Sequence, residues 1–168
     1  MWSSCGRRVG PAPGQTVGVD VTAELICLAT GDAMFAVVSD LGTYGSWLEI
    51  VAKVEAAEPE ASDPGPAWLV DLRGQLGPLR RTKRLRMVRA LAEPNRAVRF
   101  ERRELDGRKH SAWVLSAEMG PSDASSAGDV RLTMSLHYGG SLWLPVLDRM
   151  LAEEIERSST RLAELVAR

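Results

Sequence analysis

The chain has 168 residues, of which 45% are hydrophobic and 26% charged, and its formal net charge at pH 7 is −1. This length fits one domain, and a domain of this size can bury a substantial core without disulfides or metals. The near-neutral charge argues against nucleic acid or a membrane surface as a partner. No apolar run approaches the roughly 18 residues that a membrane span needs.

The two cysteines, Cys5 and Cys27, belong to no CxxC pair, so neither a disulfide framework nor a zinc site is expected. Gly and Pro, not an apolar segment, follow residues 1–8, so a signal peptide is not expected either. We therefore expect a reduced, cytoplasmic protein. Only three of the 21 basic residues are Lys, a bias that indicates a GC-rich bacterial genome.

Residues 1–15 show no periodicity and carry four Gly or Pro breakers at positions 10–14, which predicts a flexible tail before a domain over residues 16–168. Apolar residues then alternate with polar ones and predict a half-buried strand: Val17, Val19, Val21, Ala23, Leu25 and Cys27. Thr30 can cap a short helix that Gly42 ends, and residues 44–48 predict a second short helical turn.

Further strands follow, separated by Gly, Pro, Asn and Asp. They are expected over residues 51–57, 68–72, 79–91, 109–119 and 130–138, with one more around residues 98–100. Turns are expected at residues 74–78, at Glu93-Pro94-Asn95 and at Asp106-Gly107, the last a hairpin signal. Such short connections imply antiparallel pairing.

A helix is expected from about residue 140 to 167. Its apolar stripe is Leu144, Leu147, Leu151, Ile155, Ser158, Leu162 and Leu165. The residues expected to face away are Asp148, Glu153, Glu154, Arg157, Arg161 and Glu164. The predicted class is α+β: a curved antiparallel sheet of six to seven strands wrapped round a long C-terminal helix, with two short helices after the first strand.

Residues 38–48 resemble the motif of the START-like (SRPBCC) superfamily, which includes polyketide cyclase/dehydrase and lipid-transport families. Asp40, Tyr44 and Trp47 match the pattern, whereas Gly45 and Ser46 replace its proline-containing step. The resemblance covers about residues 17–167 and extends to the order of the elements. It implies a helix-grip fold with an internal apolar cavity, a fold that hosts enzymes, carriers and receptors alike.

The apolar faces of the predicted strands and helix define a candidate ligand site. The strands and the second short helix contribute Trp47, Trp68, Val70, Leu72, Leu85, Met87, Phe100, Trp113, Leu115, Met134 and Leu136. The helix contributes Trp143, Leu147 and Met150. A plain packed core is the competing interpretation for each of them, although Trp and Met suit adaptable contact with an apolar ligand.

The basic run at residues 79–89 contains no acidic residue. Alternation puts Arg81, Lys83 and Arg89 on the same face as Leu85 and Met87. We hypothesise that one or two of these cations line the pocket mouth and hold an anionic group of the ligand. The alternative is a solvated face paired with acidic residues of the next strand. Nucleic acid is not expected as a partner, because no aromatic residues interleave with the run.

The two histidines, His110 and His137, fall on outward positions, so surface roles are expected for both. Tyr138 has inward parity and is placed either to hydrogen-bond a ligand carbonyl or to anchor the corner between strand and helix. Asp40 and Glu49 are interpreted as a helix end and a loop charge. No nucleotide, hydrolase or metal motif is present, and no cofactor or metal is expected.

Three functions remain open on this basis. The first is binding of a hydrophobic or amphipathic small molecule, such as a lipid, isoprenoid or polyketide, in the cavity. The second is an enzyme of the polyketide cyclase/dehydrase type, for which an inward acid or base would be evidence. The third, drawn from the resemblance, is a ribosome- or quinone-associated interaction module with the basic strand as contact surface. A homodimer is a further possibility that the sequence leaves open.

Overall fold

The computed structural model describes residues 18–76, 79–122, 129–140, 154 and 157–167. Within these ranges it describes side chains except at positions 19, 74–76 and 79–81. The expected tail over residues 1–15 lies outside the described residues.

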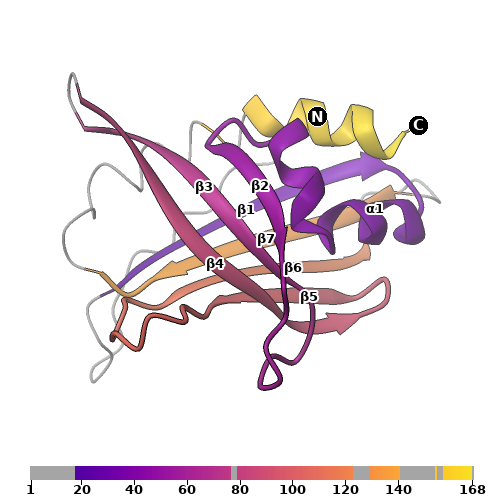
Figure 1. The fold of residues 1–168 in the computed structure, drawn as a ribbon. Helices are drawn as coiled ribbons and strands as arrows, with labels where there is room; N and C mark the ends of the chain where they lie inside the picture. The colour runs from indigo at the N-terminus through magenta and orange to yellow at the C-terminus, as the bar shows by residue number, and fades with distance from the viewer. Residues whose placement is uncertain (1–17, 77–78, 123–128, 141–153, 155–156, 168) are drawn as a thin grey trace.

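Seven antiparallel strands form a single curved sheet, which confirms the predicted class. They are β1 (Val19–Leu28), β2 (Val51–Ala57), β3 (Ala67–Leu76), β4 (Leu79–Glu93), β5 (Ala97–Arg102), β6 (Trp113–Pro121) and β7 (Asp129–Tyr138). Their order in the sheet is β1-β7-β6-β5-β4-β3-β2. The strands at the β2 end cross steeply over the direction of β1 and β7, so the sheet is strongly bent (Figure 1).

Two short helices follow β1, as the sequence predicts. Helix α1 (Gly31–Val38) is capped by Thr30, whose Oγ1 accepts from the Ala33 amide at 3.1 Å. The 3₁₀ helix η1 (Leu41–Ser46) is capped by Asp40, whose Oδ1 accepts from the Gly42 amide at 2.8 Å. The prediction that Gly42 ends the first helix is wrong. Asp40 has an extended backbone and starts a new helix, so α1 already ends at Val38.

The connections differ from the sequence prediction in two places. The expected turn at residues 74–78 is shorter, because β3 runs to Leu76 and β4 starts at Leu79. The expected tight hairpin at Asp106-Gly107 is instead part of the loop 103–112, so the strand predicted over residues 109–119 begins only at Trp113. Asp106 accepts from the Arg108 amide at 3.0 Å and binds His110, contacts that favour a compact loop over strand pairing.

The turn between β4 and β5 forms where the sequence predicts it. Asn95 adopts a left-handed backbone with φ of 58°, which Asn tolerates better than most residues. Its side-chain amide donates to Asp32 Oδ1 at 2.7 Å. The turn therefore also fixes the start of α1 against the sheet.

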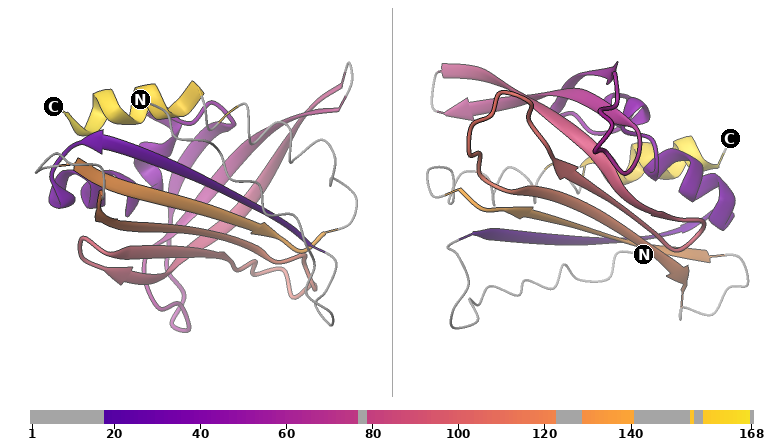
Figure 2. Two further views of the ribbon diagram at one scale, coloured as in Figure 1. Left: turned by 180° about the vertical axis from the view of Figure 1, so that it is seen from behind. Right: turned by 60° about the horizontal axis from the view of Figure 1, so that its bottom comes forward.

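The C-terminal helix lies across the concave face of the sheet, and its described part covers residues 157–166 with Glu154 one turn earlier (Figures 1 and 2). Leu162 and Val166 are buried in the core. Arg161 Nη2 donates to Glu49 Oε1 at 2.5 Å and links the helix to the segment between η1 and β2. No helix in the described part of the chain is long and apolar enough to cross a membrane.

A buried ion pair holds the loop between β2 and β3 against the outer face of the sheet. Arg86 Nη2 lies 2.6 Å from Asp63 Oδ2, and the two side chains are only 4% and 3% exposed. Arg86 also donates to the carbonyl of Glu58 at 3.1 Å and to that of Arg103 at 3.2 Å. Because the guanidinium of Arg86 binds Asp63 directly, the pKa of that carboxyl is held below its usual value.

Replacing Asp63 with Asn should lower the free energy of unfolding by about 3 kcal/mol, because it leaves a buried guanidinium without its counter-ion. In the wild type the pair stabilises the fold above the unfolded-state pKa, near 4, and this contribution is lost as pH falls through the lower folded-state pKa. Urea unfolding should therefore show a constant difference in unfolding free energy between variant and wild type near neutral pH. Below about pH 4 this difference should become smaller.

The matched control is Glu93→Gln, which removes a carboxylate from the exposed pair with Arg96. That change should alter the unfolding free energy by less than about 0.5 kcal/mol. Equal effects of the two substitutions would show that the Arg86–Asp63 pair does not anchor the loop.

Candidate ligand-binding site

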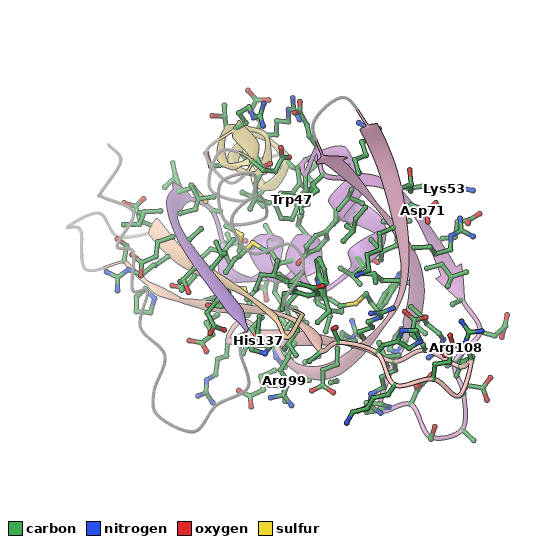
Figure 3. The ribbon with its side chains drawn as sticks, turned by 90° about the vertical axis from the view of Figure 1, so that its left-hand side faces the viewer. Trp47, Lys53, Asp71, Arg99, Arg108 and His137 are labelled. Atoms are coloured by element: carbon green, nitrogen blue, oxygen red, sulfur yellow. The ribbon has the colours of Figure 1, made fainter. Side chains whose placement is uncertain are left out.

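The concave side of the sheet, the two short helices and the C-terminal helix enclose an apolar cavity of about 120 Å³. Figure 3 views the molecule along the curved sheet, with the C-terminal helix above the interior and Trp47 beneath it. Trp47 is 3% exposed and lines the cavity from the end of η1. The cavity is thus the space that the curved sheet and its covering helices do not fill.

Nine of the predicted site residues line this cavity. They are Trp47, Val70, Leu72, Leu85, Met87, Trp113, Leu115, Met134 and Leu136. Strand alternation explains this result, since the inward residues of β3, β4, β6 and β7 converge on one face. Their contact with a ligand remains a prediction.

Two predicted residues, Trp68 and Phe100, are not among the lining residues and form an aromatic cluster with Tyr44. The ring centroids of Trp68 and Phe100 are 5.7 Å apart, and those of Tyr44 and Phe100 are 6.2 Å apart. Phe100 is fully buried. For these two residues the packed-core interpretation fits the geometry better than ligand contact does.

Tyr44 connects that cluster to the cavity, which it also lines. Its hydroxyl donates to the carbonyl of Val38 at 2.9 Å. Burial, and secondarily the charge of Asp40, raises the pKa of Tyr44 well above its usual value. The phenol therefore stays protonated and serves as a fixed donor that holds α1 and η1 together.

Other lining residues lie outside the predicted set. From β1 they are Val21, Ala23, Glu24 and Leu25; near η1 and at the start of β2 they are Leu41, Tyr44, Leu48, Ile50 and Val51; from β7 they are Leu132 and Ser135; from the helix they are Ser158, Ser159 and Leu162. The alternation in β1 and the apolar stripe of the helix had already placed five of these residues on inward faces: Val21, Ala23, Leu25, Ser158 and Leu162. The predicted contributors Trp143, Leu147 and Met150 lie outside the described residues, as does the Arg81 side chain.

Lys83 and Tyr138 meet at one edge of the site. Tyr138 is buried and packs on Trp113 with ring centroids 5.0 Å apart. Lys83 Nζ lies 5.4 Å from the Trp113 centroid and 5.3 Å from the Tyr138 centroid. Burial, and then the positive charge of Arg102, lowers the pKa of Lys83. Neither Lys83 nor Tyr138 is a lining residue, and the Tyr138 ring fits the predicted role of corner anchor.

Arg89, the third cation predicted near the mouth, has a structural contact instead. Its Nη1 donates to the carbonyl of Ser39 at 3.0 Å. Ser39 is the C-cap of α1, where backbone carbonyls lack helical partners and a cation is favourable. Arg89 therefore fixes α1 over the sheet.

Polar groups enter the site from the C-terminal helix. Glu154 is 4% exposed, which corrects the prediction that it faces away from the apolar stripe. Its Oε1 accepts from the Ile50 amide at 3.2 Å and from Ser158 Oγ at 3.1 Å. Because Ser158 lines the cavity, the buried carboxylate orients a hydroxyl at the cavity wall.

Trp47 brings a further polar atom into the site. Within the described part of the chain, its indole Nε1 is the one buried side-chain nitrogen or oxygen without a hydrogen-bond partner. An unpaired buried donor costs about 1–3 kcal/mol. Most buried polar groups in folded proteins are paired, so this indole marks an unsatisfied donor beside the cavity.

Four other titratable residues considered for catalysis, His110, His137, Asp40 and Glu49, are not among the residues that line the cavity, whereas the exposed residue Glu24 of β1 is. His137 Nδ1 is 2.7 Å from Asp20 Oδ1 on the outer face, and His110 Nε2 is 2.8 Å from Asp106 Oδ1 in the loop after β5. Asp40 caps η1, and Glu49 pairs with Arg161. Over the described ranges, no group of three or more His, Cys, Asp or Glu residues is arranged to hold a metal ion.

Solved structures with the same fold are found by comparison of coordinates. A START superfamily protein from Mycobacterium smegmatis matches with a TM-score of 0.65 at 14% identity, over 88% of this chain and 97% of that one. The di-domain ARO/CYC StfQ from the steffimycin biosynthetic pathway matches with 0.63 at 13%, over 89% of this chain and 51% of that one. The Zhui aromatase/cyclase from a Streptomyces species matches with 0.53 at 17%, over 89% and 92%.

These matches show the START-like (SRPBCC) helix-grip fold that residues 38–48 and the order of elements predict. No protein-family model and no curated protein sequence matches the chain. At 13–17% identity the relationship is one of fold, and the site must be interpreted from its own residues.

Replacing Leu162 with Ala should lower the free energy of unfolding by about 3 kcal/mol, because this side chain is 2% exposed and joins the helix to the sheet. Chemical denaturation followed by circular dichroism measures the change. The control, Leu28→Ala, removes the same atoms from a residue that is 72% exposed and should have an effect below about 0.5 kcal/mol. If the Leu162 variant were as stable as this control, the helix would not be a packed wall of the cavity.

Proposed function

We propose that this protein binds a hydrophobic or amphipathic small molecule, such as a lipid, isoprenoid or polyketide, in the cavity between sheet and helix. The observation that carries the proposal is the apolar lining, to which β1, β3, β4, β6, β7 and the C-terminal helix all contribute. Ligand sites are typically concave and mostly apolar, with a few polar groups that set orientation.

The energetic cost of the cavity supports this proposal. Protein interiors are normally close-packed, and a cavity of about 120 Å³ leaves its apolar lining without the packing contacts that a filled core provides. Larger side chains at Ala23 or Val70 would fill the space within the same fold. An apolar ligand in this space would supply the contacts that the lining side chains lack.

A cavity-filling substitution tests the proposal. Met134→Trp should remove binding, because an indole at this lining position occupies the space of the ligand. Native mass spectrometry of the purified protein should detect a co-purified apolar molecule in the wild type and none in the variant. Calorimetric titration with 1-decanol should show the same difference.

The control for that experiment is Thr133→Trp, which places the same side chain on the opposite face of β7. This variant should retain both the co-purified molecule and the response to 1-decanol. Binding that survives in Met134→Trp, or that is lost equally in both variants, would contradict a site in this cavity.

An enzyme of the polyketide cyclase/dehydrase type is the second candidate, and the Glu154–Ser158 pair is the observation in its favour. A buried carboxylate that positions a hydroxyl at an apolar cavity is suited to proton transfer during an aldol-type ring closure. The fold likeness to proteins described as aromatase/cyclases agrees with this candidate. The carboxylate already accepts from Ile50 and Ser158, however, so orientation of the hydroxyl is its better-supported role.

If the protein is a cyclase, Glu154→Gln should slow the cyclisation of a synthetic poly-β-ketone thioester by roughly 100-fold, since general acid–base catalysis is typically worth at least this factor. Product formation and regiochemistry are followed by liquid chromatography. The control, Glu164→Gln, changes an exposed carboxylate on the same helix and should leave the rate unaltered. A wild type that leaves the spontaneous product distribution unchanged would exclude this candidate.

The interaction-module candidate receives no specific support. The large exposed hydrophobic residues of the described chain are Leu28, Leu91 and Leu105, which lie on separate elements. On the basic strand, Arg84 pairs with Asp71 of β3 and Arg86 pairs with Asp63 of the β2–β3 loop, so these two charges are already neutralised within the protein. We retain a bacterial cytoplasmic location as part of the proposal, in agreement with the free thiol of Cys27.

A further inference from the structure

Lys83 occupies an unusual position in the sheet. β5 pairs with β4 only from Met87 onward, so Lys83 lies beyond the reach of β5. Its side chain instead crosses to the rings of Trp113 and Tyr138, at the start of β6 and the end of β7. The Lys83 side chain therefore connects β4 to the facing ends of β6 and β7.

Residues that line the cavity surround this position. Leu72 is directly opposite Lys83 in the register of β3 and β4, and Leu85 is the next inward residue along β4. Both line the cavity, and so does Trp113, whose ring faces the amine. Lys83 thus places a charged group at the edge of an otherwise apolar space.

Among the residues that the structure describes, no carboxylate pairs with the ammonium of Lys83. Nearby arginines are paired: Arg84 lies 2.6 Å from Asp71, and Arg102 Nε lies 2.6 Å from Glu104 Oε1. Glu104 attracts Lys83 at longer range but is bound to Arg102, and no carboxylate of the described residues lies within 4.0 Å of Lys83 Nζ. A half-buried cation without a carboxylate partner is uncommon, because burial of an unpaired charge is unfavourable.

The aromatic contacts hold the ammonium without neutralising it. The faces of Trp113 and Tyr138 attract a cation and keep it at a fixed place. An ammonium has three N–H donors, and ring faces are weaker partners for them than an anion. The group is therefore held in place with capacity for a strong hydrogen-bond acceptor.

We propose that Lys83 binds the carboxylate of an amphipathic ligand whose apolar part fills the cavity. This inference rests on the proposed binding function and specifies its ligand class as an aliphatic or polyketide monocarboxylate. Among the described residues at this edge, one unpaired ammonium balances one negative charge, whereas the second charge of a phosphate monoester would remain uncompensated beside apolar walls. On the other side of the cavity, the C-terminal helix contributes the neutral hydroxyl of Ser158, which adds no positive charge.

Pairs of ligands with the same alkyl group distinguish the contribution of the carboxylate to affinity from that of the alkyl group. Decanoate and 1-decanol have the same alkyl length and differ in the charged group. In isothermal titration calorimetry, wild-type protein should bind decanoate at least roughly tenfold more tightly than 1-decanol, the usual range for a hydrogen bond to a charged group. Octyl and dodecyl pairs repeat the comparison at other lengths.

Lys83→Met keeps a long apolar side chain and removes the charge. In this variant the preference for decanoate should disappear while the affinity for 1-decanol stays within about twofold. The control is Lys53→Met, which changes an exposed lysine that pairs with Glu55 at 2.7 Å and should keep the full preference. Thermal unfolding of each variant verifies that the fold is intact.

The outcomes distinguish the inference from the function on which it rests. If wild type binds the alcohol and the acid equally, or if Lys83→Met retains the preference, the Lys83 inference is overturned and the cavity proposal stands. If no chain length of either ligand binds and no apolar molecule co-purifies, the proposed function itself fails. A preference lost in both lysine variants would indicate general electrostatic attraction and would also overturn the inference.

Discussion

The constraint on which this structure depends is the need to cover the concave face of a strongly bent sheet. The inward residues of the seven strands form an apolar face, and exposure of this face to water is unfavourable. The elements available to cover it are α1, η1 and the C-terminal helix. Cylindrical helices do not fill a bent surface completely, and the remaining space is the cavity. Fold and site therefore have one physical origin.

Polar contacts at the edge of the concave face hold the covering elements in place. Arg89 binds the end of α1, Asn95 binds its start through Asp32, and Glu154 accepts from the Ile50 amide next to η1. These contacts are directional, whereas apolar packing alone would allow the helices to shift and close the cavity. The arrangement preserves an open space because it is fixed around the rim and apolar within.

Strand alternation in the sequence was sufficient to predict which side of the sheet a residue faces, but not its depth or its neighbours. Leu85 and Phe100 both face inward, yet Leu85 lines the cavity and Phe100 lies in the core between Tyr44 and Trp68. Arg86 alternates with the inward residues Leu85 and Met87 and faces outward, but it is buried because the loop between β2 and β3 folds over it. Such outcomes depend on long-range packing, which local periodicity does not encode.

The helix shows the same limit in another form. A simple apolar stripe assigns Glu154 to the solvent side, yet the backbone amide of Ile50 makes its burial favourable by providing a hydrogen-bond donor. Lys83 is the converse case, because its inward parity was visible in the sequence, while the lack of a carboxylate partner among the described residues emerged only from the coordinates. Both groups place charge beside an apolar space, one satisfied by the protein and one not. The unsatisfied charge is the stronger indication of ligand chemistry, since a protein gains nothing from burying it alone.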